Sequence, residues 1–169
     1  MALRKVPKGN YMILGGVAIL VICACFAFYN VYNIIQDAKI SKSPLATKEV
    51  KLEDLNETSK DIGADQFLFI SYTQNETVYG NEKGIKKILS KYNLLDNVMY
   101  LDVTDFIDDE KTIDKINEDL KLGDTLKVEK VPAIIYYKDG VATKTIDSKD
   151  HILQPGDIQQ IIDIYELAS

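Results

Sequence analysis

The stretch KVPAIIYYKDG, from Lys130 to Gly140, decides the fold of this chain. Its apolar run, Ala133 to Tyr137, has the length and composition of a β-strand. Asp139-Gly140 favours a tight hairpin turn, so we expect Val141 to Ile146 to return as an antiparallel strand. Pro132 stands at the head of the first of these two strands. We therefore expect a β-hairpin near the end of the chain, followed by one last helix.

Strand-like and helix-like patterns alternate before this hairpin. Strands are predicted at Val50–Leu52, Phe67–Ile70 and Val98–Val103, and helices at Glu53–Glu57, around Ile85–Tyr92, from Asp108-Asp109-Glu110 to Leu120, and from Pro155 to Tyr165. The order β-α-β-α-β-α-β-β-α predicts an α/β domain with a largely parallel sheet that helices cover on both faces. The hairpin at its end makes the sheet mixed.

This order, together with Val131-Pro132 before an apolar strand, resembles the thioredoxin fold over roughly Val50 to Leu167. The resemblance implies that Pro132 is a cis proline, although only about 5–6% of X–Pro bonds are cis in general. It also implies that Pro132 faces the place of the redox dipeptide, and that the backbone before it pairs with an extended substrate. The chain is most similar to the membrane-tethered, thioredoxin-like bacteriocin transport accessory proteins of Gram-positive bacteria.

The redox motif of that family is missing. After the strand at Phe69-Ile70 the family has C-P-x-C, whereas this chain reads SYTQNETVYG, with Asn75 and Val78 at the cysteine positions. Thiol exchange needs a thiolate nucleophile, and the two cysteines, Cys23 and Cys25, both lie in the apolar N-terminal run. Two apart on a helix, they point to nearly opposite sides and cannot replace a CxxC pair. We therefore predict a redox-inactive domain that is not an enzyme on its own.

The loop after the second strand and the Pro132 loop adjoin in the thioredoxin fold, so together they predict a partner-binding groove. Its candidate residues are Tyr72, Asn75, Glu76, Thr77, Val78, Tyr79, Val131 and Pro132. Loops at strand ends often carry function. The alternative is a decayed site that only caps the following helix, with Thr77 or Asn81 as N-cap.

The N-terminal segment has the composition of a membrane span. No charged residue occurs from Gly9 to Gln36, and roughly 20 apolar helical residues cross a bilayer. We expect a cytoplasmic N-terminus at residues 1–10, a transmembrane helix at 11–33, a linker at 34–48 and the thioredoxin-like domain at 49–169.

Charge sets the expected direction of this span. Arg4, Lys5 and Lys8 precede it, whereas Asp37 is the first charge after it. The positive-inside rule then places the domain outside the cell membrane, with the lipid bilayer contacting residues 11–33. Two alternatives remain open: a cleaved signal peptide, and a lipoprotein signal at Ile22-Cys23-Ala24-Cys25 with Cys25 as the lipidated residue.

The net charge of −6 excludes one class of partner. Apart from Arg4, Lys5 and Lys8, the chain has 17 basic against 26 acidic side chains. Such an acidic domain is repelled by phosphates, so nucleic-acid binding is excluded.

We expect an exported polypeptide or a membrane transport or secretion protein as partner. The alternatives are an oxidoreductase or isomerase role with thiols supplied by a partner, and a structural membrane subunit that packs through Gly15, Gly16 and Ala18.

No cofactor or metal site is expected either. Asp102, Asp105, Asp108, Asp109 and Glu110 lack the ligand spacing of a calcium-binding loop. His151 is the single histidine and has no evident catalytic or zinc-binding partners. The run Gly80 to Lys86 has the wrong glycine spacing for a phosphate-binding loop.

Overall fold

The structure is a computed structural model that describes residues 8–107 and 109–167. It divides into two units, Met1–Lys39 and Ile40–Ser169. Arg4, Lys5 and Asp108 lie outside the described residues, and so does the side chain of Lys8.

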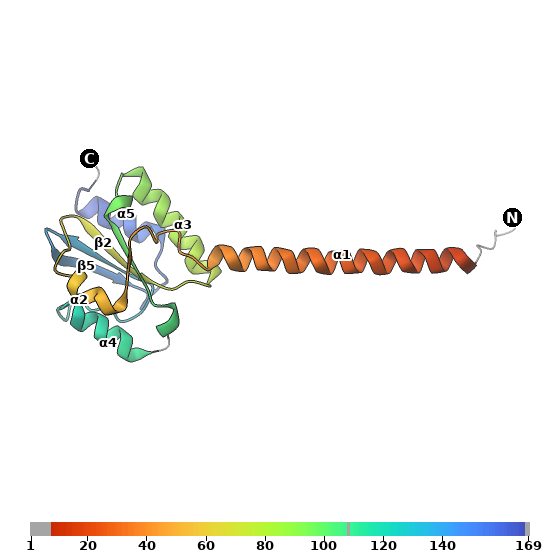
Figure 1. Ribbon diagram of the computed structural model, residues 1–169. Helices are drawn as coiled ribbons and strands as arrows, with labels where there is room; N and C mark the ends of the chain where they lie inside the picture. Colours follow the sequence, from red (N-terminus) through yellow and green to blue (C-terminus); the bar gives the residue numbers. More distant parts are fainter. Residues whose placement is uncertain (1–7, 108, 168–169) are drawn as a thin grey trace. The chain divides into compact units, whose positions relative to one another are not determined.

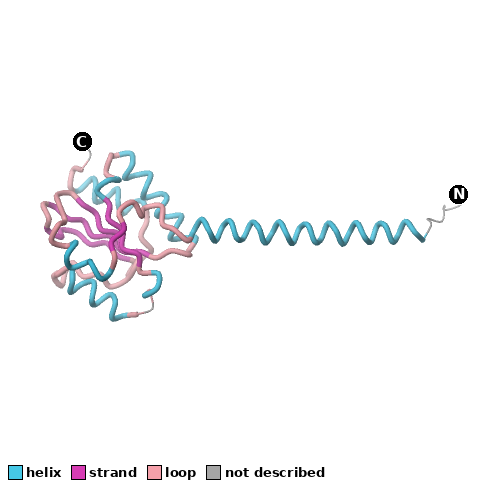
Figure 2. Tube along the Cα trace, in the orientation of Figure 1, coloured by secondary structure: helices cyan, strands magenta, loops and turns pink. Residues whose placement is uncertain are grey.

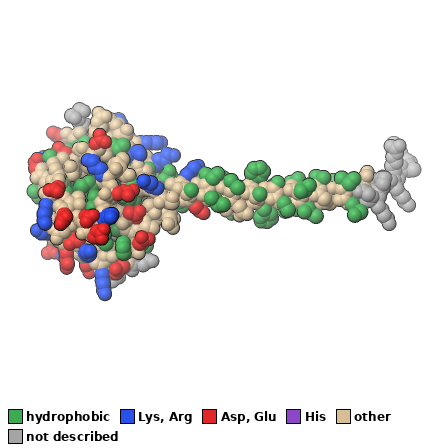
Figure 3. All heavy atoms as spheres, viewed as in Figure 1, with side chains coloured by type: hydrophobic (Ala, Val, Ile, Leu, Met, Phe, Trp, Pro, Cys, Tyr) green, Lys and Arg blue, Asp and Glu red, His purple; other side chains and the backbone are tan. Residues whose placement is uncertain are grey.

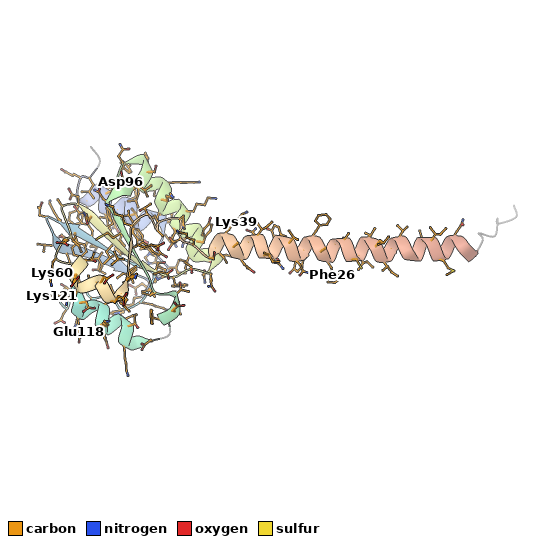
Figure 4. All side chains as sticks on the ribbon, viewed as in Figure 1. Phe26, Lys39, Lys60, Asp96, Glu118 and Lys121 are labelled. Carbon is orange, nitrogen blue, oxygen red and sulfur yellow. The ribbon has the colours of Figure 1, made fainter. Side chains whose placement is uncertain are left out.

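The described residues of the first unit form one long helix, α1 (Lys8–Ile40), which ends at the first residue of the second unit (Figure 1). Its 33 residues extend about 50 Å at 1.5 Å per residue. Hydrophobic side chains line it along its length (Figure 3), and Phe26 projects outward from it (Figure 4). Its part from Met12 to Ile40 is long and apolar enough to cross a membrane, a property that a signal sequence shares. The helix continues past residue 33 because residues 34–40 contain neither proline nor glycine.

The second unit is built on a five-stranded sheet with the strand order β1-β3-β2-β4-β5. The strands lie at the centre of the domain, with helices and loops around them (Figure 2). The strands are β1 (Glu49–Val50), β2 (Gln66–Ser71), β3 (Val98–Asp102), β4 (Ala133–Lys138) and β5 (Val141–Asp147). β1, β3 and β2 are parallel, β4 pairs antiparallel with β2, and β5 pairs antiparallel with β4. The predicted hairpin is confirmed, and Asp139 (φ 52°) and Gly140 (φ 78°) form its turn in the left-handed region that this turn requires.

Helices cover both faces of the sheet, as expected for an α/β domain. Helices α3 (Glu76–Lys91) and α5 (Pro155–Ile164) lie on one face, and α2 (Leu55–Thr58) and α4 (Glu110–Asp119) on the other. Side chains alternate between the two cores along each strand. In β2, Phe67 and Phe69 pack toward α3 and α5, whereas Leu68 and Ile70 pack toward α2 and α4. This strand order, with these directions and helix layers, confirms the thioredoxin-like fold.

The segment between α1 and β1 belongs to the domain rather than connecting loosely to it. Leu45 is fully buried in the core beneath α3 and α5, and Ser43 is buried as well. The Nζ of Lys86 in α3 donates a hydrogen bond to the Pro44 carbonyl (2.8 Å). The prediction of a linker at residues 34–48 rests on the irregular, polar stretch that contains Ser41, Ser43 and Pro44, and Leu45 within that stretch belongs to no apolar repeat that would indicate burial.

Candidate functional site

The side chain of Asn75 begins helix α3. Its Oδ1 accepts hydrogen bonds from the backbone N–H groups of Thr77 and Val78, both at 3.0 Å, while its own backbone is extended. The expectation that Thr77 or Asn81 is the N-cap is therefore wrong. The helix begins at Glu76, about two and a half turns before the apolar repeat at Ile85 that marked it in the sequence, so that repeat does not locate the N-cap.

The eight candidate groove residues differ in burial and in their surroundings. Tyr72 is half-buried and packs in the same core as Val131. Val78 and Pro132 are both buried and line one small cavity. Glu76 and Thr77 are exposed in the first turn of α3. Asn75 and Tyr79 are half-buried, and Tyr79 does not line that cavity.

The backbone of Val131 differs from that of its neighbours in its hydrogen bonding. The peptide bond between Val131 and Pro132 is cis. The Lys130 carbonyl accepts from the N–H of Ser148 (3.3 Å), and the Pro132 carbonyl accepts from the Ser148 hydroxyl (2.6 Å). In contrast, the N–H and C=O of Val131 form no hydrogen bond with any residue that the structure describes. A donor and an acceptor on one residue are what an extended peptide needs for pairing.

A buried carboxylate lies beneath this region, and the sequence analysis missed it. Glu82 in α3 is only 4% exposed. Its carboxylate accepts hydrogen bonds from the hydroxyls of Ser43 (2.6 Å), Ser71 (2.6 Å) and, at 3.4 Å, Tyr100. The spacing of residues 78, 82, 85 and 89 puts Glu82 on the apolar face of α3. An acid on that face is the signal that could have identified it.

Burial determines the ionisation of this cluster. It raises the pKa of Glu82, and the negative charge of Asp102 adds to the rise, while the hydrogen bonds from Ser43, Ser71 and Tyr100 oppose it. The pKa of the Tyr100 hydroxyl is raised as well, first by burial and then by the neighbouring Glu82. Tyr100 therefore stays protonated and remains a donor to the carboxylate.

The cavity next to Glu82 is too small for a ligand. It encloses about 10 Å³, which is about the space of one water molecule. The residues that line it are Phe69, Ser71, Val78, Asn81, Glu82, Ile85, Pro132, Ile152 and Leu153. Pockets for small molecules usually enclose 300 Å³ or more. A small substrate therefore does not fit into this cavity.

The remaining polar clusters of the sequence have structural roles. Asp109 accepts a hydrogen bond from Lys111 N–H and begins α4, and Asp102 accepts from the backbone N–H of Thr104. His151 lies at the surface with its Nε2 3.1 Å from Asp157, which also accepts from Gln154 N–H at the start of α5. Gly80 and Gly84 lie inside α3. Among the described residues, no three His, Cys, Asp or Glu side chains are grouped to hold a metal ion.

Comparison with solved structures finds thioredoxins among the chains that are similar to this one. No family model and no curated protein matches it. Thioredoxin f2 of Chlamydomonas reinhardtii is 5% identical, with a TM-score of 0.49 over 72% of this chain and 98% of that chain. Thioredoxin O2 of Arabidopsis thaliana, in its oxidised state, is 14% identical, with a TM-score of 0.45 over 73% and 96%. The fold assignment itself rests on strand order and direction.

Proposed function

We propose that this protein is a membrane-anchored binding module whose thioredoxin-like domain holds an extended polypeptide without redox chemistry. In this proposal α1 is an uncleaved anchor and the domain lies outside the cell membrane. The partner is an exported polypeptide or a component of a transport or secretion system, as the resemblance to bacteriocin transport accessory proteins implies. Recognition takes place between the Tyr72–Tyr79 loop and Val131-Pro132.

The observation that carries this proposal is the unpaired backbone of Val131. Its N–H and C=O form no hydrogen bond with the described residues, although Lys130 and Pro132 on either side are both bonded to Ser148. A peptide strand that adds to Val131 gains backbone hydrogen bonds regardless of its sequence. Glu76 and Thr77 are exposed in the first turn of α3, and Val78 in the same turn lines one small cavity with Pro132, so their side chains contribute specificity. The domain contains no cysteine, so the binding needs no covalent step.

Site-specific photo-crosslinking in the native host tests this proposal. A probe at the exposed Thr77 is compared with a control probe at the exposed Gln160 of α5. A single dominant product from Thr77 alone identifies a dedicated partner, whereas a range of exported chains indicates a holding role. If Thr77 yields nothing while Gln160 or α1 yields a product, the groove is not the binding surface.

Exchange of the anchor separates the groove from a structural role of the span. Residues 11–33 are replaced by an unrelated single-pass span that keeps the flanking charges. The Thr77 product persists if the groove binds the partner. Its loss, with the protein still in the membrane, would mean that the span makes the main contact.

A further inference from the structure

The domain begins where the long helix ends, with no free length of chain between them. Ile40, the last residue of α1, is the first residue of the second unit, and its carbonyl accepts a hydrogen bond from the N–H of Gln74 (2.9 Å). Ser43 follows shortly after and donates to the buried Glu82. Gln74 lies in the loop between β2 and α3, which is one side of the proposed peptide groove. The end of α1 is therefore joined directly to this groove.

This junction limits how far the groove can lie from the bilayer when α1 is an uncleaved anchor. The uncharged run from Gly9 to Gln36 extends about 42 Å along a helix, comparable with the roughly 40–45 Å of a bilayer that includes its headgroup layers. Asp37 then marks the bilayer surface. Ile40 is three residues further on, which is about 4.5 Å in a helix and at most about 11 Å in an extended chain. The limit depends on chain length alone, so it holds for every orientation of the domain.

The edge of the sheet that borders the groove exposes apolar and acidic side chains. β2 and β3 are parallel and end side by side, and the segment after β3 exposes Phe106 (44%) and Ile107 (41%). The N–H of Thr73 donates to the hydroxyl of Thr104 (2.8 Å), which joins this segment to the loop after β2. Carboxylates at this edge are exposed as well, namely Glu76, Asp102, Asp105 and Asp109. These charges repel an anionic lipid surface, whereas the exposed apolar pair favours contact with the side chains of a polypeptide.

We propose that the groove binds a polypeptide that is inserted in the same bilayer, through the extended segment with which that polypeptide leaves the membrane. The segment pairs with the backbone of Val131 and packs against Phe106 and Ile107. β4 and β3 lie on either side of β2, so the two contacts are about 10 Å apart, which three extended residues can span. This inference rests on the proposed function and narrows its partner to membrane-inserted chains. The short junction raises the effective concentration of the groove for such a chain and has no such effect for a chain in solution.

The position of the crosslinked residue within the partner tests this proposal. A photo-reactive residue replaces Thr77 in the full chain in native membranes, and mass spectrometry identifies the residue to which it is joined. We expect that residue to lie within about 10 residues of the end of a transmembrane segment, because ten extended residues already reach about 35 Å. A product further from any span, a soluble exported chain or a lipid adduct as the sole product overturns the proposal but leaves the groove as a binding surface. Failure of the proposed function itself has a different signature, in which Thr77 yields nothing and Gln160 yields the product.

A longer junction provides the second test. An insertion of 20 Gly and Ser residues between Gln36 and Asp37 adds a root-mean-square distance of about 25 Å between the span and the domain. We expect the yield of the Thr77 product to fall several-fold, because the groove is no longer held beside the emerging segment. The same insertion between Leu3 and Arg4, on the other side of the span, is the matched control and leaves the yield unchanged. An unchanged yield from a junction variant with the wild-type unfolding midpoint overturns the proposal.

Discussion

The hydroxyl of Ser43 donates a 2.6 Å hydrogen bond to the carboxylate of Glu82, which lies 39 residues further along the chain. The same carboxylate accepts from Ser71 at the end of β2, at 2.6 Å. Glu82 therefore joins three segments: the residues that follow α1, the strand before the candidate groove, and the helix after it. One buried side chain therefore links three separate segments of the domain.

Truncation of Glu82 is expected to destabilise the domain strongly. Glu82→Ala leaves the buried hydroxyls of Ser43 and Ser71 without their acceptor and creates a cavity, so we expect a loss of about 2–4 kcal/mol. Glu82→Gln keeps an acceptor oxygen and nearly the same volume, and should cost about 1 kcal/mol. Denaturant unfolding of the full chain in detergent measures both. Wild-type stability of Glu82→Ala would show that the cluster does not support the fold.

The stability that depends on Glu82 should decrease as pH rises. The pKa of Glu82 is raised above its ordinary value of 4.5, so the folded state holds this proton more tightly than the unfolded state. The resulting stabilisation is complete below pH 4.5 and is lost as pH rises through the folded-state pKa. We expect the difference in free energy of unfolding between wild type and Glu82→Gln to follow this course from pH 4 upward. A difference that is constant with pH, or that grows, contradicts it.

The cap of α3 can be tested by substitutions two residues apart. Asn75→Ala removes the acceptor for the N–H groups of Thr77 and Val78 and should cost about 1 kcal/mol. Asn75→Asp keeps this acceptor and adds a negative charge at the helix N-terminus, so it should retain or improve stability. Thr77→Ala is the control, because the exposed Thr77 side chain caps nothing. A greater loss of stability in Thr77→Ala than in Asn75→Ala would show that Thr77, and not Asn75, is the N-cap of α3.

The full chain should not catalyse insulin reduction, because its domain contains no thiol. The double substitution Asn75→Cys with Val78→Cys places a thiol at the N-cap and another in the first turn of α3. A helix N-terminus lowers the pKa of a thiol, so we expect this variant to gain measurable turnover. Turnover by the unmodified protein would contradict a non-redox function. Inactivity of the folded double variant would show that these positions do not match the family's cysteines.

Much of this protein can be predicted from its sequence because the evidence is local. The apolar runs at 67–70, 98–101 and 133–137 indicate buried strands, and Asp139-Gly140 indicates the turn that the structure shows. The uncharged run from Gly9 to Gln36 indicates a helix long enough to span a membrane. The missing CxxC is also a property of the sequence alone, and it requires no knowledge of contacts.

Tertiary structure alone decided which polar side chains are buried and what they bind. Glu82 meets Ser43 across 39 residues and Ser71 across 11, and Leu45 enters the core from a segment that reads as a linker. The buried Tyr137 hydroxyl, in contrast, has no hydrogen-bond partner among the described residues. The spacing of apolar residues along the sequence indicates whether a side chain faces a core. A hydrogen bond between distant segments depends on how those segments cross, and it leaves no repeating pattern in the sequence.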